Sequence, residues 1–494
     1  MTHASQAIGL PARFSLRTAA TVAVYVTIFF LLLPGLLWTL GGRLDALLVL
    51  PPARGVLVRS AGAAALLFGA VWMVWAMWLL WRTGRGLPIS HLPPVRLTTR
   101  GPYAVTRHPI YVGYVAAFAG AGAVTGSVGR SVIVATLLAL GSVVYAFGFE
   151  EERLERRFGA LWAAYRGTTP AFPVLLPAPL RSALVTLWQH CRPPIERIAN
   201  RVVLVRVRAT TWVTFGVFAA AAAAVISAGI AAALAGAGLS PVRIGWCLVG
   251  LAVAVPVGAR VMWLAYRVEQ LRADPRNTLR QVGFVSWGGI LGFFGFATAF
   301  GWLAHLDVLR LLDAVAVAGL AGLAVARLGC FTYGCCYGRP SALGIRWTDP
   351  EAKPVREHGA AGIVPRVPTQ LLSSAAAAVL FMTLLVVLRR GGTPGTVCGL
   401  AFLGYGVLRF GIECLRADPR DGPWRLTQGQ VGCVVIACLG LALLLLVPEA
   451  PRPAPAPAPA LDFTVLLPLA PIVALCSALV LGVYGFHRRQ VGRW

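Results

Sequence analysis

The sequence predicts an all-α polytopic membrane protein with about twelve transmembrane helices in two fused domains. Of its 494 residues, 58% are hydrophobic and only 13% are charged, whereas about a quarter of a soluble domain is charged. Its mean hydropathy is +0.74. Apolar runs of roughly 18 residues or more recur along the chain, and each is long enough to cross a bilayer as a helix.

The apolar runs also give the position of each predicted span. We place the spans near residues 18–40, 58–81, 109–127, 131–149, 210–236, 244–266, 283–303, 309–328, 369–388, 396–412, 429–447 and 463–486. The first run is too long for the core of a removable signal peptide, and it lacks the small-residue cleavage site that follows such a core. We therefore expect it to remain as a membrane helix.

The segments between the spans divide the chain into domains. Arginines around a predicted break at Pro193-Pro194 make one segment a basic connector. A Pro/Ala run that opens at Pro451 predicts a stiff polyproline spacer. We expect a first membrane domain at 1–178, the connector at 179–209, a second membrane domain at 210–448, the linker at 449–462, and a C-terminal span with a basic tail at 463–494.

One six-residue segment occurs twice. Leu271–Arg276 and Leu415–Arg420 both read LRADPR, and both lead toward a Gln-Val-Gly. Each copy ends a predicted helix at Asp-Pro. The repetition indicates either a structural repeat or the chance reuse of a common helix stop.

The net charge of +26 comes from arginines spread over many short loops rather than from one basic face, so we exclude a nucleic-acid partner. Membrane proteins collect Lys and Arg on the cytoplasmic side. The loops 41–57 and 304–308 and the Pro/Ala run carry few arginines. The basic segments would then face the cytoplasm of a bacterial inner membrane; these are 153–208, 267–280, 339–366, 409–425 and the tail.

Two arginines, Arg327 and Arg409, lie inside separate apolar helices. A cation within a span costs at least about 2.5 kcal/mol, so it normally has a partner or a function. A lipid phosphate is a natural partner, because a guanidinium group matches its oxygens two at a time. The two arginines therefore indicate an enzyme that acts on phospholipid.

A second group of polar residues lies at the ends of predicted spans in the first domain. Pro109 breaks the chain directly after Arg107 and His108, and Glu150 and Glu151 end the next span on the same side. A sulfonium cofactor with an amino-acid tail and a ribose needs such groups: carboxylates for its hydroxyls and amine, and Arg or His for its carboxylate. The alternative is that these are ordinary interfacial charges that pair with each other.

The pattern R-H-P-x-Y-x-G, followed by E-E-x-x-L-x-x-x-F-G, resembles the isoprenylcysteine carboxyl methyltransferase family, which includes phospholipid methyltransferases. The resemblance covers roughly residues 60–175. It implies that S-adenosylmethionine binds at the cytoplasmic face and that the methyl acceptor enters from the bilayer. Trp162 stands where the family usually has Tyr, which keeps an aromatic residue. The implied cofactor-binding residues are Arg107, His108, Tyr111, Glu150 and Glu151.

Five elements of the second domain resemble the prolipoprotein diacylglyceryl transferase family across roughly residues 210–448. They are the segments around Arg327 and Arg409, together with Trp287–Gly292, Pro368–Leu371 and Leu426–Gln430. The resemblance implies that a diacylglyceryl group moves from phosphatidylglycerol to a lipoprotein cysteine thiol while glycerol phosphate leaves.

The same resemblance implies roles for individual residues. The two arginines would stabilise charge on the leaving group, and Tyr405 and Glu413, one turn either side of Arg409, would orient it. The paired glycines would allow a helix or a lipid headgroup to approach closely. The implied catalytic residues are Arg327, Arg409, Tyr405 and Glu413, and the implied substrate-binding residues are Gly288, Gly289, Arg339, Arg416 and Gln370; no metal is expected.

Several polar residues of that family are replaced in this chain. Trp287 and Val367 stand in place of two histidines. Two asparagines and a glutamate are replaced by Cys330, Tyr333 and Cys335. A thiol acceptor must lose its proton before it attacks, and only His305 or His358 remains as a base, provided that the fold brings one of them to the site. Phospholipid binding is therefore expected, while the lipoprotein or lipid acceptor stays open.

The cysteines Cys330, Cys335 and Cys336 allow three interpretations. Zinc binding is disfavoured because the paired C-x-x-C units and a nearby histidine pair are missing. A redox or covalent role is conceivable, since Arg327 and Arg339 would lower a thiol pKa. Simple packing of small residues near the headgroup is favoured.

Three functions are compatible with the sequence. The first is a bifunctional lipid-modifying enzyme, with methyl transfer in the first half and glyceryl or headgroup transfer in the second. Another is a lipoprotein diacylglyceryl transferase with an accessory methyltransferase domain, and the third is a non-catalytic lipid-binding protein or transporter. The diacylglyceryl transferase family works at the periplasmic face, which conflicts with the cytoplasmic side that the arginine distribution favours.

Overall fold

The computed structural model describes residues 16–84, 94–173, 178–208, 210–281, 283–418, 426–448, 462–488 and 491. The chain forms two compact units, Met1–Leu175 and Leu176–Trp494. The predicted Pro/Ala linker lies outside the described residues except for its last residue, Asp462.

The predicted all-α membrane fold is confirmed. Eleven helices within the described residues are long and apolar enough to cross a membrane, and a shorter apolar helix, Pro109–Val124, gives a twelfth. Each predicted span coincides with one of these helices. The sheet in the described residues is small: β1 (Val203–Val207), β2 (Thr210–Val213) and β4 (Phe486–Arg488) pair in the order β1-β2-β4, both pairs antiparallel.

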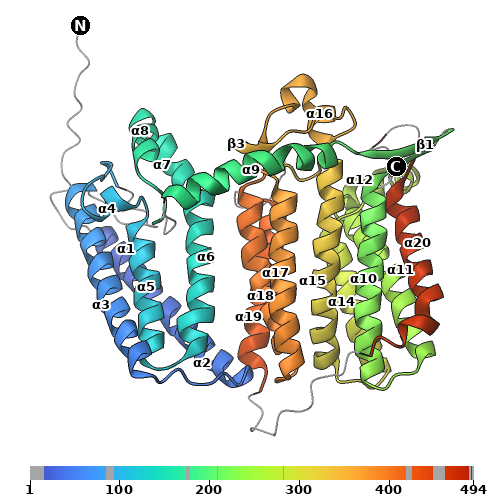
Figure 1. The fold of residues 1–494 in the computed structure, drawn as a ribbon, viewed down its shortest axis with the longest axis horizontal. Coiled ribbons are helices and arrows are strands. Elements are labelled where there is room, and N and C mark those ends of the chain that lie inside the picture. Colours follow the sequence, from blue (N-terminus) through green and yellow to red (C-terminus); the bar gives the residue numbers. More distant parts are fainter. Residues whose placement is uncertain are drawn as a thin grey trace. The chain divides into compact units, whose positions relative to one another are not determined.

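The first unit consists of membrane helices with a few short helices at one end (Figure 1). Its longer helices are α1 (Leu16–Val26), α2 (Leu33–Leu47), α3 (Val56–Leu79), α5 (Pro109–Val124) and α6 (Ala135–Tyr145), and its shorter ones are α4 (Pro102–Val105), α7 (Glu151–Phe158) and α8 (Ala160–Thr168). A π-helical turn, Ala146–Glu150, joins α6 to α7. Helices α3 and α5 approach closely at two glycines, since a Cβ on Gly69 would lie 2.5 Å from the carbonyl oxygen of Gly113.

The second unit contains eight spans: α10 (Thr214–Gly236), α11 (Pro241–Ala265), α14 (Ser286–Leu303), α15 (Val308–Tyr333), α17 (Thr369–Arg390), α18 (Thr396–Cys414), α19 (Gln428–Leu446) and α20 (Leu466–Gly485). Buried side chains such as Ile230, Leu248, Val315 and Leu469 form one of its hydrophobic cores. The remaining elements lie across one end of the spans (Figure 1); they are the small sheet, α9 (Ala178–Ala199), α12 (Val268–Ala273), α13 (Pro275–Arg280), β3 (Pro340–Ile345) and α16 (Lys353–His358).

The prediction that the connector breaks at Pro193-Pro194 is wrong, because helix α9 continues through both prolines. Contacts with another part of the second unit hold the helix on both sides of the prolines. The side chain of Arg192 donates to the carbonyl of Ala342 (3.3 Å), and that of Asn200 donates to the carbonyl of Arg346 (3.0 Å). Both acceptors belong to residues 334–368, which we call the cap. Contacts on either side of the prolines thus hold α9 against the cap.

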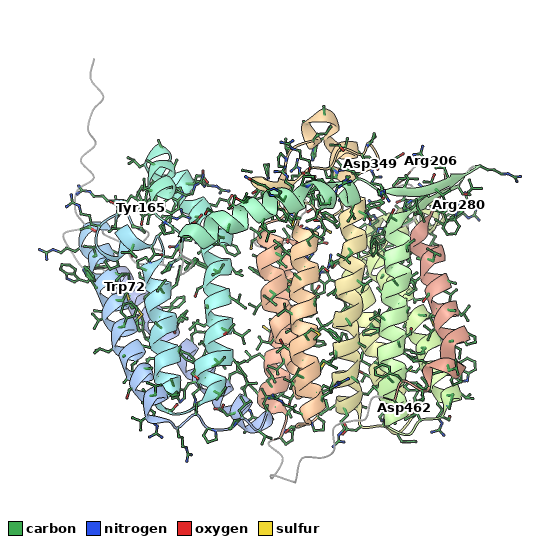
Figure 2. The ribbon with its side chains drawn as sticks, viewed as in Figure 1. Trp72, Tyr165, Arg206, Arg280, Asp349 and Asp462 are labelled. Atoms are coloured by element: carbon green, nitrogen blue, oxygen red, sulfur yellow. The ribbon has the colours of Figure 1, made fainter. Side chains whose placement is uncertain are left out.

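Basic residues occur at both ends of the second unit, so the difference in charge between the ends is smaller than a count over the predicted loops suggests. Figure 2 shows Arg206, Arg280 and Asp349 at one end of this unit and Asp462 at the other. The end with Asp462 also carries basic residues that flank the spans, namely Arg243, Arg389 and Arg390. The arginine distribution therefore favours a cytoplasmic position of the cap only weakly.

A buried carboxylate fixes the start of α18 to α15. Asp313 of α15 accepts hydrogen bonds from the backbone N–H groups of Gly395 (2.8 Å) and Cys398 (2.7 Å) at the beginning of α18. These N–H groups have no partner within their own helix. Both helices run from this end toward the cap, so Asp313 sets the relative height of the residues that they carry at the cap end.

Candidate active sites

Three arginines of the second unit gather at the cap end of α15 and α18. Arg327 lies in the last two turns of α15, and Arg409 lies in the last two turns of α18. Arg416 follows directly after α18. All three interact electrostatically with the thiol of Cys336, which lies between the two helices in sequence. The fold therefore brings together arginines that are far apart in the chain.

Two of these arginines already have carboxylate partners. Arg409 forms an ion pair with Glu413 and donates to the hydroxyl of Ser373 (3.0 Å). Arg416 donates to Glu413 Oε1 (3.0 Å) and makes a two-pronged contact with Asp418 at 2.7 and 2.9 Å. The five side chains form one network in which each guanidinium group is balanced by a carboxylate.

Arg327 differs from the other two arginines. Its side chain makes no ion pair or hydrogen bond with any described residue, and its Nε is buried without a partner. Among ionisable groups, Tyr405 interacts with it most strongly. The sequence predicts that Tyr405 orients Arg409, but the described residues contain no hydrogen bond between these two side chains. No carboxylate of the described residues pairs with Arg327, and the ionisable groups beside it are Tyr405 and the thiols of the three cysteines. A bound anion would add a partner for this cation within the membrane helix.

Backbone pairing in the cap connects the ends of the two helices. Gly334, with φ +69°, ends α15, and the chain then returns toward α18. The Arg339 N–H donates to the carbonyl of Leu415 (2.9 Å), and the Ala417 N–H donates to the carbonyl of Tyr337 (3.1 Å). This short antiparallel contact explains how two distant sequence motifs form one site.

Helix α17 provides the third wall. Ser373 holds Arg409, and Ser374 donates to the carbonyl of Ala324 on α15 (2.6 Å). One turn earlier, Gln370 is 1% exposed and its Nε2 donates to the carbonyl of Cys335 (2.6 Å). The predicted Gln370 is thus a member of the site, while Ser373 is a member that the sequence reading missed.

The remaining residues predicted for substrate binding have other surroundings. A Cβ on Gly288 would lie 2.2 Å from the carbonyl oxygen of Gly258 on α11, so Gly288 allows two helices to touch. Gly289 also faces α11. The side chain of Arg339 is exposed on the cap, and only its backbone joins α18. Trp287, at the position of the family's histidine, packs against Gly432 of α19.

Neither candidate base is within the arginine cluster. His305 lies at the opposite end of α15, and the helix from Val308 to Arg327 is roughly 28 Å long at 1.5 Å per residue. His358 is exposed at the outer side of the cap, where its Nε2 is 2.8 Å from the hydroxyl of Tyr337. The structure therefore rules out His305 as a base for this site.

Three free thiols lie beside the arginines. The Cys335 thiol donates to the backbone carbonyl of Cys330 (3.6 Å). The neighbouring Cys335 side chain, together with the positive charges of Arg416, Arg327 and Arg409, outweighs burial and holds the pKa of Cys336 well below its usual value of 9.0. Within the described part of the chain, no group of three or more His, Cys, Asp or Glu side chains is arranged to hold a metal ion.

The two LRADPR segments have different roles. In the second copy, Asp418 pairs with Arg416. The first copy lies between α12 and α13, where Asp274 caps α13 by accepting from the N–H of Asn277 (3.1 Å). The shared sequence marks a helix end in both places, but only the second copy contributes to the arginine cluster.

The candidate site of the first unit forms where α5 begins and α6 ends. His108 is the residue before α5, and its N–H donates to the carbonyl of Ala171 (3.3 Å). The Arg107 N–H donates to the carbonyl of Pro170 (2.9 Å). The Pro-containing segment after α8 thus fixes the R-H-P motif, and this end of the unit also carries Tyr165 (Figure 2).

All five predicted cofactor-binding residues meet in one network. Arg107 Nη2 lies 2.6 Å from Glu151 Oε1, which is also 3.4 Å from His108 Nε2. Glu150 Oε2 lies 3.3 Å from His108 Nδ1 and accepts from the Tyr111 hydroxyl (2.6 Å). Burial lowers the pKa of His108, but hydrogen bonds to both glutamates and their negative charge outweigh it and raise the pKa above 6.5.

A cavity of about 490 Å³ adjoins this network, a size typical of small-molecule sites. Its wall contains the carboxylate of Glu150, the aromatic rings of Tyr111 and Trp162, and the guanidinium group of Arg107. Two buried donors have no partner in the described residues, Arg107 Nε and Trp162 Nε1. Unsatisfied donors beside carboxylates and aromatic rings fit a ligand that carries amine, hydroxyl and carboxylate groups, as S-adenosylmethionine does.

Comparison with known families confirms both resemblances. The family described as Phospholipid methyltransferase matches residues 57–160, which contain the network around His108. The family described as Prolipoprotein diacylglyceryl transferase matches residues 202–446, which contain all three arginines.

Individual relatives agree with the second match. The phosphatidylglycerol–prolipoprotein diacylglyceryl transferase of Methylococcus capsulatus is 31% identical over 202 residues, which cover 39% of this chain and 73% of that protein. The enzyme of the same name from Cereibacter sphaeroides is 30% identical over 223 residues, covering 40% and 74%. That from Clostridium tetani is 29% identical over 189 residues, covering 37% and 73%.

Proposed function

The chain belongs to the prolipoprotein diacylglyceryl transferase family through residues 202–446, and from this premise we propose that its second unit transfers a diacylglyceryl group from phosphatidylglycerol. The relatives are named as transferases that use this lipid, and this chain is likewise a transferase. The observation that carries the proposal is that Arg327 has no carboxylate partner among the described residues and that its Nε is buried without a hydrogen-bond acceptor. A phosphodiester would supply an anion and accept two hydrogen bonds from one guanidinium group.

The proposed reaction breaks the bond between the glyceryl carbon and a phosphate oxygen. The acceptor forms a bond to that carbon, its proton leaves to a base, and glycerol phosphate departs with the electron pair of the broken bond. Negative charge grows on the phosphate in this step, and a fixed cation beside it lowers the barrier. We assign this role to Arg327, with Arg409 held beside it by Glu413 and Ser373.

The acceptor is proposed to differ from an ordinary lipoprotein thiol. A thiol near pKa 8.5 needs a base at neutral pH, and Trp287 cannot accept a proton. His305 lies at the far end of α15, and His358 is bonded to Tyr337 at the outer side of the cap. A lipoprotein cysteine remains the alternative acceptor, because the matched relatives are named for it.

We further propose that the first unit transfers a methyl group from S-adenosylmethionine, which makes the protein bifunctional. The cofactor supplies an activated methyl group. Glu150 and Tyr111 would hold its hydroxyl and amine groups, while Arg107 would hold its carboxylate. Support comes from the closed network of these residues with His108 and Glu151 beside a cavity of suitable size. The family match covers the same residues.

Calorimetry on the purified protein in detergent tests cofactor binding. We expect binding to the wild-type protein and a loss of about 10-fold or more for Glu151→Ala. This carboxylate holds Arg107 and His108 in place, and a charged hydrogen bond contributes about 1.5–3 kcal/mol. Glu152→Ala is the matched control, since the ion pair of Glu152 within the described residues is with the exposed Arg156, one turn on along α7. Folded wild-type protein that fails to bind millimolar cofactor would refute the assignment.

Two further experiments test the whole proposal in a bacterial inner membrane, which is the location we propose. Cells that express the protein and receive methyl-labelled methionine should contain a labelled lipid that is missing from cells without it, as shown by mass spectrometry. Membranes that contain the protein and supply the acceptor should consume phosphatidylglycerol and release glycerol phosphate, and membranes without the protein should not. A non-catalytic lipid-binding protein or transporter would give neither result.

A further inference from the structure

One buried acceptor in the arginine cluster has no hydrogen-bond donor. The side chain of Gln370 is 1% exposed. Its Nε2 donates to the carbonyl of Cys335 at 2.6 Å. Because a carbonyl can only accept, this hydrogen bond fixes the orientation of the side-chain amide group. The other end, Oε1, is buried and lacks a partner among the described residues.

This acceptor lies at the same height as Arg327. Helices α15 and α17 are antiparallel, and Ser374 of α17 donates to the carbonyl of Ala324 of α15. From that contact, one turn toward the cap leads to Arg327 on α15 and to Gln370 on α17. Arg327 Nε is the corresponding orphan donor. At this level along the helices, α15 thus carries a buried donor and α17 a buried acceptor, neither with a partner among the described residues.

Such a pair is costly unless a ligand satisfies it. An unpaired buried polar group destabilises a protein by about 1–3 kcal/mol, and it persists where a ligand completes its bonding. A phosphate can satisfy Arg327, but it carries no hydrogen at neutral pH for Gln370 Oε1. The ligand must therefore carry a hydrogen-bond donor close to its phosphate.

We propose that Gln370 Oε1 accepts a hydrogen bond from a hydroxyl of the donor lipid's headgroup, so that Gln370 selects a glycerol headgroup. The inference rests on the proposed use of a phospholipid by this unit. An ammonium headgroup is disfavoured, because the described residues place three guanidinium groups here, and the ion pairs of two of them, Arg409 and Arg416, use the carboxylates of Glu413 and Asp418. A neutral hydroxyl donates without adding to that positive charge.

Neighbouring contacts show that Gln370 is held rigidly enough to discriminate. Its neighbour Thr369 donates to the carbonyl of Cys336. Two successive residues at the start of α17 thus form hydrogen bonds with the backbone of the cap. Cys336 itself has φ +62°, an unfavourable conformation for a residue with a side chain. The cap loop is thus fixed against α17, and the position of the amide is fixed with it.

The test compares two lipids and two proteins. Phosphatidylglycerol is matched with phosphatidylpropanol, which has the same phosphate but no headgroup hydroxyl. Binding of each lipid is measured by calorimetry or by competition in mixed micelles with phosphatidylcholine. Gln370→Met keeps the size of the side chain and removes the acceptor. Because only the ratio between the lipids is used, a general loss of packing cancels.

We expect the wild-type protein to prefer phosphatidylglycerol to phosphatidylpropanol by about 10-fold, and Gln370→Met to bind the two lipids about equally. Thr383→Ala, a change on the same helix that removes an exposed local contact with the carbonyl of Val379, should keep the wild-type ratio. Phosphatidylethanolamine should bind more weakly than phosphatidylglycerol to the wild-type protein.

Equal binding of the two lipids by the wild-type protein, or an unchanged preference in Gln370→Met, would overturn the role of Gln370. The proposed function would fail differently. In that case neither anionic lipid would bind better than phosphatidylcholine, and Arg327→Gln would have no effect on either.

Discussion

Arg409 and Glu413 form an ion pair within one turn of α18, and both side chains are almost completely buried. Glu413 also accepts from Arg416 at 3.0 Å. Glu413 therefore pairs with two guanidinium groups, and Arg416 also pairs with Asp418. Arg327 on the facing helix pairs with no carboxylate of the described residues, and we propose that the substrate phosphate fills this role. We therefore expect the paired arginines and Arg327 to respond differently to substitution.

Removing the charge of Glu413 should destabilise the second unit. Glu413→Gln leaves Arg409 buried without its anion, and breaking a buried ion pair from one side costs about 3–5 kcal/mol. We expect a clear fall in the melting temperature in detergent. Asp307→Asn is the control, because Asp307 pairs with Arg310 at an exposed position. Equal melting temperatures for both variants would show that the network is not structural.

Arg327 and Arg409 should act as one clamp on a single phosphate. If either loss disables the clamp, then Arg327→Gln and Arg409→Gln should each reduce phosphatidylglycerol turnover about as much as the double variant does. The measurement is turnover of labelled lipid by the four proteins in micelles. Effects that multiply simply would mean that the arginines bind different groups.

The first unit should become less stable to unfolding as the pH rises and His108 loses its proton. The folded pKa of His108 is raised above 6.5, so the stabilisation from its contacts with Glu150 and Glu151 is complete below about pH 6.5 and is lost as pH rises through the raised pKa. Melting curves from about pH 6 to pH 9 should show this decline for the wild-type protein, and His108→Gln should flatten it. A His108→Gln variant with the wild-type slope would contradict the assignment.

The sequence was sufficient for the spans and for the R-H-P and Glu150-Glu151 network, because both follow from local features: long apolar runs, and polar residues placed at helix ends. It was not sufficient for contacts between distant elements. Asp313 reaches the start of α18, and α9 passes through Pro193-Pro194 because the cap holds it. The exclusion of His305 likewise depends on the length of α15.

The arginine cluster shows the same limit at the level of single residues. Helical spacing correctly places Glu413 beside Arg409, one turn away on the same face. Helical spacing also places Tyr405 on this face of α18, yet Tyr405 interacts electrostatically with Arg327 of the neighbouring helix α15. Whether Gly288 faces a helix or a lipid cannot be read from Trp287–Gly292, whereas the structure shows the carbonyl of Gly258 against it.

The chain should not replace an ordinary prolipoprotein diacylglyceryl transferase. Loss of a general base costs about 100- to 10,000-fold in rate, and Trp287 occupies the position where the family places a histidine. We expect no growth rescue of a strain depleted of that enzyme by the wild-type chain, and partial activity for Trp287→His. Rescue by the wild-type chain would contradict this and would direct attention to His358 or a cysteine as the base.

The most direct test of the proposed transfer is the release of glycerol phosphate from phosphatidylglycerol by membranes that contain the protein and supply the acceptor. Wild-type protein and Arg310→Gln are compared with Arg327→Gln; Arg310 lies on the same helix at the opposite end and pairs with Asp307. We predict release by the first two proteins and a rate lower by about 100-fold or more for Arg327→Gln, the typical effect of removing a group that stabilises transition-state charge. Equal release by Arg327→Gln and the wild-type protein, or no release by folded wild-type protein, would contradict the account.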